Sequence, residues 1–125
     1  MRTTATVFQM LVRLSGLVQI VLGILFWTGN APALIPVHIL VGLLLVLSLW
    51  GLAFIAARSG APVGQVVVAF AWGLVVPVFG LTQDQLVMGD AHWLIKVLHL
   101  LVGLAAIGMA EGLGRRIRQA RAAAA

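Results

Sequence analysis

Residues 14–57 read LSGLVQIVLGILFWTGNAPALIPVHILVGLLLVLSLWGLAFIAA, without one charged side chain. A membrane-spanning helix needs about 20 mostly apolar residues, so this stretch is long enough for two. The segment Gly29-Asn30-Ala31-Pro32 interrupts it near the middle, and residues of these types favour a turn. The stretch therefore predicts two membrane-spanning helices joined by a short loop.

The rest of the chain continues this pattern. A third uncharged run covers residues 59–83, and a fourth apolar run extends from about 91 to about 112. The chain is 62% hydrophobic and 9% charged, whereas a soluble domain carries about 25% charged residues. We therefore expect one all-α membrane domain over residues 1–125, a four-transmembrane-helix bundle. Its helices are expected near 5–28, 32–57, 62–86 and 91–119.

The charged residues predict an orientation. All seven arginines lie at ends of the expected spans: Arg2, Arg13, Arg58, Arg115, Arg116, Arg118 and Arg121. If the chain crosses four times, they gather on one side, which the positive-inside rule makes the cytoplasmic side. We expect a multi-pass protein of a bacterial plasma (inner) membrane with both termini in the cytoplasm. A nucleic-acid binder would carry a basic face within its fold, so the expected partner is the lipid bilayer and not a nucleic acid.

A repeat links the second and fourth spans. Residues 38–43 read HILVGL and residues 99–104 read HLLVGL. Gly29-Asn30-Ala31 precedes the first copy and Gly89-Asp90-Ala91 precedes the second, so Asn30 and Asp90 are predicted helix N-caps. We predict two duplicated helical hairpins, about 5–57 and about 62–119. Both histidines would then lie roughly 12–14 Å along their helices from the outer cap, on helices that face each other.

Two facing imidazoles in a helical bundle are typical axial ligands of a haem. His38 and His99 are the candidate iron ligands. Gly42 and Gly103, four residues on and about 40° around the same helix faces, would leave room for a flat ring. For either histidine alone, a hydrogen bond between helices is the more ordinary interpretation. An ionisable residue inside a span nevertheless suggests function, and these two are equivalent by the repeat.

In this arrangement the chain resembles small membrane b-type cytochromes, in which haem lies inside a four-helix bundle between histidines of two helices. The resemblance covers the architecture of the chain and the paired His-x-x-x-Gly. It implies electron transfer, with one haem b per chain held by His38 and His99. Many such cytochromes hold two haems and need four ligands, whereas this chain has three histidines. One haem near the outer face is therefore expected.

Other polar residues are assigned supporting roles. His92, two turns before His99, and Lys96 are expected to meet the haem propionates at the outer interface; a solvated histidine and a snorkelling lysine are the plain alternative. Gln19 and Gln83 are expected to bond between helices or brace a cofactor. Arg13 and Glu111 are expected to pair, with Glu111–Arg115 as the local alternative.

Three interpretations of function remain open. The first is a haem-b electron carrier or redox subunit near the outer membrane face, exchanging electrons with a quinone or an extracytoplasmic partner. The second is a cofactor-free accessory subunit of a larger membrane complex, and the third is a chlorophyll-type pigment protein. A stand-alone enzyme is not favoured, since no hydrolytic triad, membrane carboxylate pair or phosphate loop is present. A homo-oligomer and a hetero-oligomer both fit the sequence.

Overall fold

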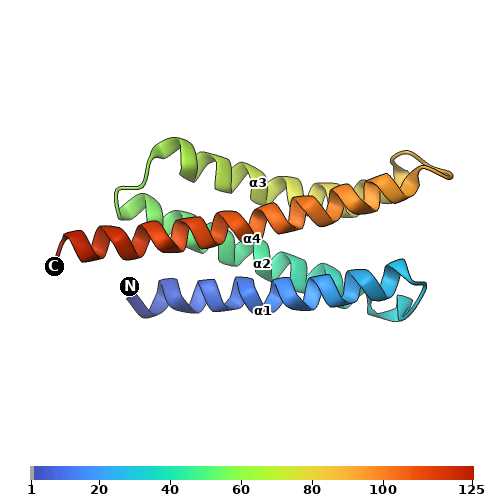
Figure 1. The fold of residues 1–125 in the computed structure, drawn as a ribbon, viewed down its shortest axis with the longest axis horizontal. Coiled ribbons are helices and arrows are strands. Elements are labelled where there is room, and N and C mark those ends of the chain that lie inside the picture. The colour runs from blue at the N-terminus through green and yellow to red at the C-terminus, as the bar shows by residue number, and fades with distance from the viewer. Residues whose placement is uncertain (1) are drawn as a thin grey trace.

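The fold is a bundle of four long helices. The computed structural model describes residues 2–125, with side chains from Thr3 onward. The helices are α1 (Arg2–Trp27), α2 (Ile35–Arg58), α3 (Val63–Thr82) and α4 (His92–Ala123), with short 3-10 turns η1 (Pro32–Leu34) and η2 (Gln83–Gln85) (Figure 1). Each of the four is long and apolar enough to cross a membrane. The predicted all-α architecture, with four helices able to span a membrane, is confirmed.

Both predicted caps are wrong, and the helix bounds differ accordingly. Ala31 stands at the N-cap of η1 and Ala91 at that of α4, and neither makes a side-chain cap. The Asn30 amide instead donates to Oγ1 of Thr28 at 3.0 Å. Backbone groups close the second turn, where the His92 amide donates to the Gly89 carbonyl at 3.0 Å. The residue types of Asn30 and Asp90 suggested side-chain caps, whereas the described helix starts have none.

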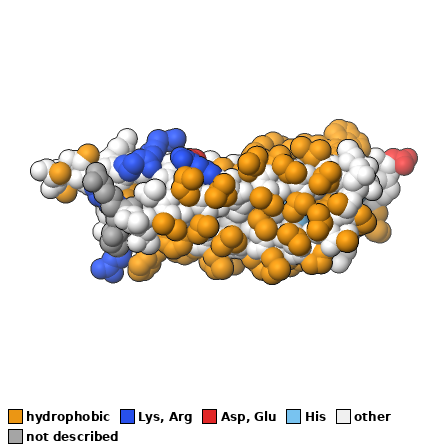
Figure 2. Space-filling view, turned by 90° about the horizontal axis from the view of Figure 1, so that it is seen from below, with side chains coloured by type: hydrophobic (Ala, Val, Ile, Leu, Met, Phe, Trp, Pro, Cys, Tyr) orange, Lys and Arg blue, Asp and Glu red, His pale blue; other side chains and the backbone are white. Residues whose placement is uncertain are grey.

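The two ends of the bundle differ in chemistry. Both termini lie at one end, together with Arg58 and the arginines of α4 (Figure 1); we call it the basic end. The opposite end, the histidine end, contains the loops at residues 28–31 and 86–91. Figure 2 shows the blue basic side chains gathered towards one end of the visible face, while hydrophobic side chains cover most of the remainder. This is the charge separation expected of a protein that crosses a membrane.

Close packing is concentrated towards the basic end. Eight residues of α2 are buried, all between Leu45 and Ala56. At the histidine end, residues 20–27, 35–42, 74–82 and 92–101 contain only Leu22 and Ile95 as buried residues. Protein interiors are normally packed to crystal-like density. The four helices therefore lack a continuous side-chain core of their own around the histidine end.

Two tryptophans form hydrogen bonds that link α3 to α2 and α4. Trp50 of α2 donates from Nε1 to the carbonyl of Phe70 at 3.2 Å, and a Cβ at Gly73 would collide with its indole. Trp72 of α3 donates from Nε1 to the carbonyl of Val102 in α4 at 3.0 Å. A buried indole N–H needs such a partner, so these bonds fix the position of α3 against both α2 and α4.

Candidate functional site

His38 and His99 meet inside the histidine end of the bundle. Their ring centroids lie 6.2 Å apart with the ring planes inclined at 52°. His38 lies about 5 Å inside the start of α2 and His99 about 10 Å inside the start of α4, less deep than predicted, since the helices begin after the expected caps. His38 and His99 are 61 residues apart in the sequence. The structure brings their side chains together, as the repeat predicts.

Each histidine also contacts a phenylalanine from the first helix of its own hairpin. Phe26 of α1 meets His38 edge to face at 5.4 Å between ring centroids. Phe79 of α3 lies 5.9 Å from His99 by the same measure. Each imidazole is thus half-buried, with a phenylalanine ring and the other imidazole beside it.

The histidine nitrogens are incompletely satisfied. Nδ1 of His38 and Nδ1 of His99 are buried and have no hydrogen-bond partner among the described residues. Leaving a buried polar atom without a partner costs about 1–3 kcal/mol, and buried polar groups in native proteins are normally bonded. Two such atoms therefore lie close together, and both lack a partner within the described chain.

The glycines around the histidines play unequal parts. A Cβ at Gly42 would lie 2.7 Å from Nε2 of Gln19, so the space beside Gly42 holds the Gln19 amide and is not left open for a ring. A Cβ at Gly103 would meet no described atom within 4 Å, so that position is open. Gly80 of α3 gives His99 its room, because a Cβ there would lie 3.2 Å from the imidazole Cε1.

His92 and Lys96 lie at the start of α4, on the side of the site expected for them. Nδ1 of His92 lies 3.1 Å from the Leu86 carbonyl, so the ring is held against the α3–α4 loop. Its Nε2 is 3.9 Å from Oδ1 of Asp84, an exposed carboxylate. Lys96 forms no ion pair with any residue that the structure describes. Their predicted contact with a cofactor remains a prediction.

The donor set limits what the site could hold. Nowhere in residues 2–125 do three His, Cys, Asp or Glu side chains come together as a metal site. Zinc, which proteins bind through three or four side chains, does not suit two imidazoles. A metal carried in a tetrapyrrole does suit them, because the macrocycle supplies the equatorial nitrogens and leaves two opposite positions. Two imidazoles on opposite sides of one metal have centroids about 6 Å apart, since each metal–nitrogen bond is about 2 Å and a ring nitrogen lies about 1 Å from its ring centre.

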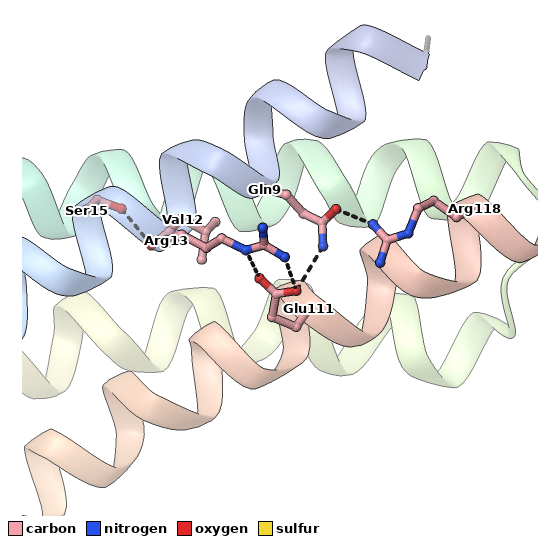
Figure 3. A network of polar contacts seen from close by, with 6 residues as sticks. All are labelled: Gln9, Val12, Arg13, Ser15, Glu111 and Arg118. Atoms are coloured by element: carbon pink, nitrogen blue, oxygen red, sulfur yellow. Dashed lines mark hydrogen bonds and ion pairs between the residues drawn. The ribbon is translucent and has the colours of Figure 1, made fainter.

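A second polar cluster lies nearer the basic end and joins α1 to α4 (Figure 3). Arg13 donates to both oxygens of Glu111, from Nε at 2.6 Å and from Nη2 at 2.9 Å. Gln9 donates to Glu111 at 3.0 Å and accepts a bond from Arg118 at 2.5 Å. The predicted Arg13–Glu111 pair is confirmed; Gln9 and Arg118 were not foreseen as its partners.

Four features of these sites could not be found from sequence spacing. Phe26, Phe79 and Gly80 reach the histidines from neighbouring helices, so no periodicity connects them to His38 or His99. Gln9 enters the cluster because Gly114 leaves space for it on α4. The one available signal was that Gln9 is a polar residue within an apolar span.

Comparison with known proteins identifies no relative for this chain. No protein family model matches the sequence, no curated protein matches it, and no solved structure matches the fold. The case for a function therefore depends on the geometry of the histidine end.

Proposed function

We propose that the protein is a membrane-embedded haem b protein that transfers electrons, with the haem held between α2 and α4 by His38 and His99. The observation that carries the proposal is the pair of imidazoles 6.2 Å apart between centroids, each with a buried nitrogen that has no partner in the described chain. That spacing is the one expected for two ligands on opposite sides of a single metal.

The surrounding helices supply what such a group needs. The sparse core of the histidine end, where only Leu22 and Ile95 are buried within the segments around the site, leaves apolar surface for a large flat ring to cover. Phe26 and Phe79 pack against the two imidazoles. When bound, haem supplies a one-electron carrier whose potential depends on its axial ligands and on burial. The chain's own part is to fix the ligands and exclude water.

The orientation of the site belongs to the same proposal. The arginines gather at the basic end, and the positive-inside rule puts that end, with both termini, on the cytoplasmic side of a bacterial plasma membrane. The histidine end then lies on the extracytoplasmic side. At that end His92 would donate a hydrogen bond to a propionate and Lys96 would offer a charge to the same group, because carboxylates cannot remain unpaired in hydrocarbon. Electron exchange with a quinone or an extracytoplasmic protein follows from this placement. The matching hairpins, each with a phenylalanine on its histidine, are in keeping with an ancestral duplication.

A fusion and a vesicle experiment test the orientation. A reporter fused after Ala125 should read cytoplasmic. A membrane-impermeant reductant should reduce the haem faster in right-side-out than in inverted vesicles. Equal rates, or the reverse order, would contradict the orientation without touching the ligand assignment.

Substitution of each histidine tests the ligand assignment. His38→Ala and His99→Ala should each abolish a six-coordinate low-spin haem spectrum, because each removes one axial imidazole. His92→Ala should keep that spectrum, since His92 bonds to the α3–α4 loop, and at most change the reduction potential. All three purified proteins would be compared for haem content and helical circular dichroism. Loss of haem from His92→Ala alone would show that the pairing is wrong.

A further inference from the structure

A groove lies between the beginning of α1 and the end of α4, at the basic end. It has a volume of about 460 Å³ and is lined by Ala5, Thr6, Gln9, Gly114, Ile117, Arg118, Arg121, Ala122 and Ala125. Two guanidinium groups therefore share a concave space whose other walls are mostly small or apolar. This groove is remote from the histidine pair, and nothing in the proposed electron transfer uses it.

One guanidinium nitrogen of this groove has no partner within the described residues. Nη2 of Arg121 is buried and has no hydrogen-bond partner among residues 2–125. Arg118 donates one nitrogen to Gln9. Glu111 is already bound by Arg13 through two hydrogen bonds. Asp84 and Asp90 stand at the histidine end, and the α-carboxylate of Ala125, which lines the groove, makes no hydrogen bond with Nη2 of Arg121. This nitrogen is therefore open to an anion from outside the chain.

The depth of the groove identifies the source of that anion. Between His92 and Arg118 the axis of α4 rises about 39 Å, whereas the hydrocarbon core of a bilayer is about 30 Å thick and the whole bilayer about 40–45 Å. With His92 at the outer edge of one headgroup layer, Arg118 at about 39 Å and Arg121 at about 44 Å along the helix lie in the headgroup layer on the opposite side. Arginine forks bind phosphate with two parallel hydrogen bonds.

Apolar surface leads from the groove towards the centre of the bilayer. Met10 follows Thr6 by one helical turn on α1, and Leu17 continues the same stripe two turns further. Their side chains are 45% and 61% exposed. An acyl chain attached to a phosphate in the groove would therefore have an apolar path along α1. A free phosphate ion would make no use of this stripe.

We propose that this groove is a binding site for the phosphate headgroup of an anionic phospholipid, with Arg121 and Arg118 as its ligands. The site anchors the basic end in the headgroup layer and holds the start of α1 against the end of α4. It does not depend on the haem proposal, since it shares no residue with the histidine pair.

Lipid retention by the purified full-length protein tests the site. Native mass spectrometry would measure the affinity for dioleoylphosphatidylglycerol and, as a zwitterionic control, dioleoylphosphatidylcholine. Arg121→Gln should weaken phosphatidylglycerol binding about tenfold, since a charge-assisted hydrogen bond is lost. Arg115→Gln is the matched control, because Arg115 is an exposed arginine of the same helix that does not line the groove. It should change the affinity less than about twofold, as expected for a screened surface charge.

Three outcomes would overturn the proposal. The first is equal affinity of the wild-type protein for the two lipids. The second is an equal loss in Arg121→Gln and Arg115→Gln, which would indicate diffuse attraction to a basic helix and no defined site. The third is complete displacement of phosphatidylglycerol by millimolar inorganic phosphate, which would make the ligand a free anion. Unchanged helical circular dichroism in both variants shows that neither result comes from unfolding.

Discussion

At the scale of single residues, the histidine end keeps polar groups that the chain leaves unsatisfied. Besides the Nδ1 atoms of His38 and His99, Oε1 of Gln19 is buried without a partner within the described residues. Each such atom costs about 1–3 kcal/mol. Under the proposed function, an external ligand would offset part of this cost at the two histidines.

Gly80 offers a residue-scale test that leaves both histidines in place. Gly80→Leu should push the His99 ring from its position, because even a Cβ at residue 80 comes within 3.2 Å of that ring. Overpacking of about 1–3 kcal/mol should weaken haem binding by about tenfold or more, measured by haem titration of the apoprotein. Gly64→Leu, on the same helix, meets nothing within 4 Å and should bind like the wild type. Equal affinities in the two variants would remove Gly80 from the site.

At the scale of elements, the contact between α1 and α4 depends on a small residue facing a large one. Gln9 lies where a Cβ of Gly114 would be, and from there it links Glu111 and Arg118. Gly114→Leu should therefore force these helices apart and lower the free energy of unfolding by about 1–3 kcal/mol.

The control for this change is Gly108→Leu in the same helix, where a Cβ meets no described atom within 4 Å. Both variants gain helix propensity equally, so the difference between them isolates the contact with Gln9. Unfolding in mixed detergent micelles would measure it. Equal stability of the two variants would show that the Gln9 cluster does not hold α1 to α4.

The sequence predicts the number of helices well, because hydropathy determines it. It predicts the residues at which helices begin poorly, because the backbone conformation of the turns determines them. Four apolar runs predict four helices because a helix satisfies its own backbone hydrogen bonds in lipid. α2 begins later than predicted because the 3-10 turn η1 precedes it, and α4 because Ala91, and not Asp90, occupies its N-cap position. The end of α4 lies beyond the predicted residue 119 because its arginine-rich tail remains helical to Ala123.

Only part of the candidate site could be predicted from the sequence. His38 and His99 could be paired because a repeat placed them at one depth on helices of one direction. The space at Gly42 could not be predicted, since Gln19 comes from another helix and fills it. The phenylalanines that flank the histidines are two among many apolar residues of α1 and α3. In a sequence made mostly of apolar residues, the membrane-spanning helices can be predicted, but the contacts between them cannot.

At the scale of the whole molecule, the bundle has a packed half and a sparsely packed half. Leu49 is completely buried in α2, whereas Leu40 of the same helix is 66% exposed. Leu49→Ala should lower the free energy of unfolding by about 1–2 kcal/mol, mainly because it leaves a cavity. Little transfer free energy is added, because the alternative environment of the side chain is lipid and not water. Leu40→Ala should change the stability by less than about 0.5 kcal/mol. A similar loss in both variants, measured without haem, would show that the histidine end is packed by the chain itself.

The most direct test of the central claim is an absorption spectrum of the purified protein from haem-replete cells, oxidised and then reduced with dithionite. Ligation by His38 and His99 predicts a Soret band and a sharp α-band on reduction, as low-spin b haem with two imidazoles gives, at one haem per chain. A folded but colourless protein that also binds no added haem would contradict the account. The histidine pair would then be a packing contact between α2 and α4.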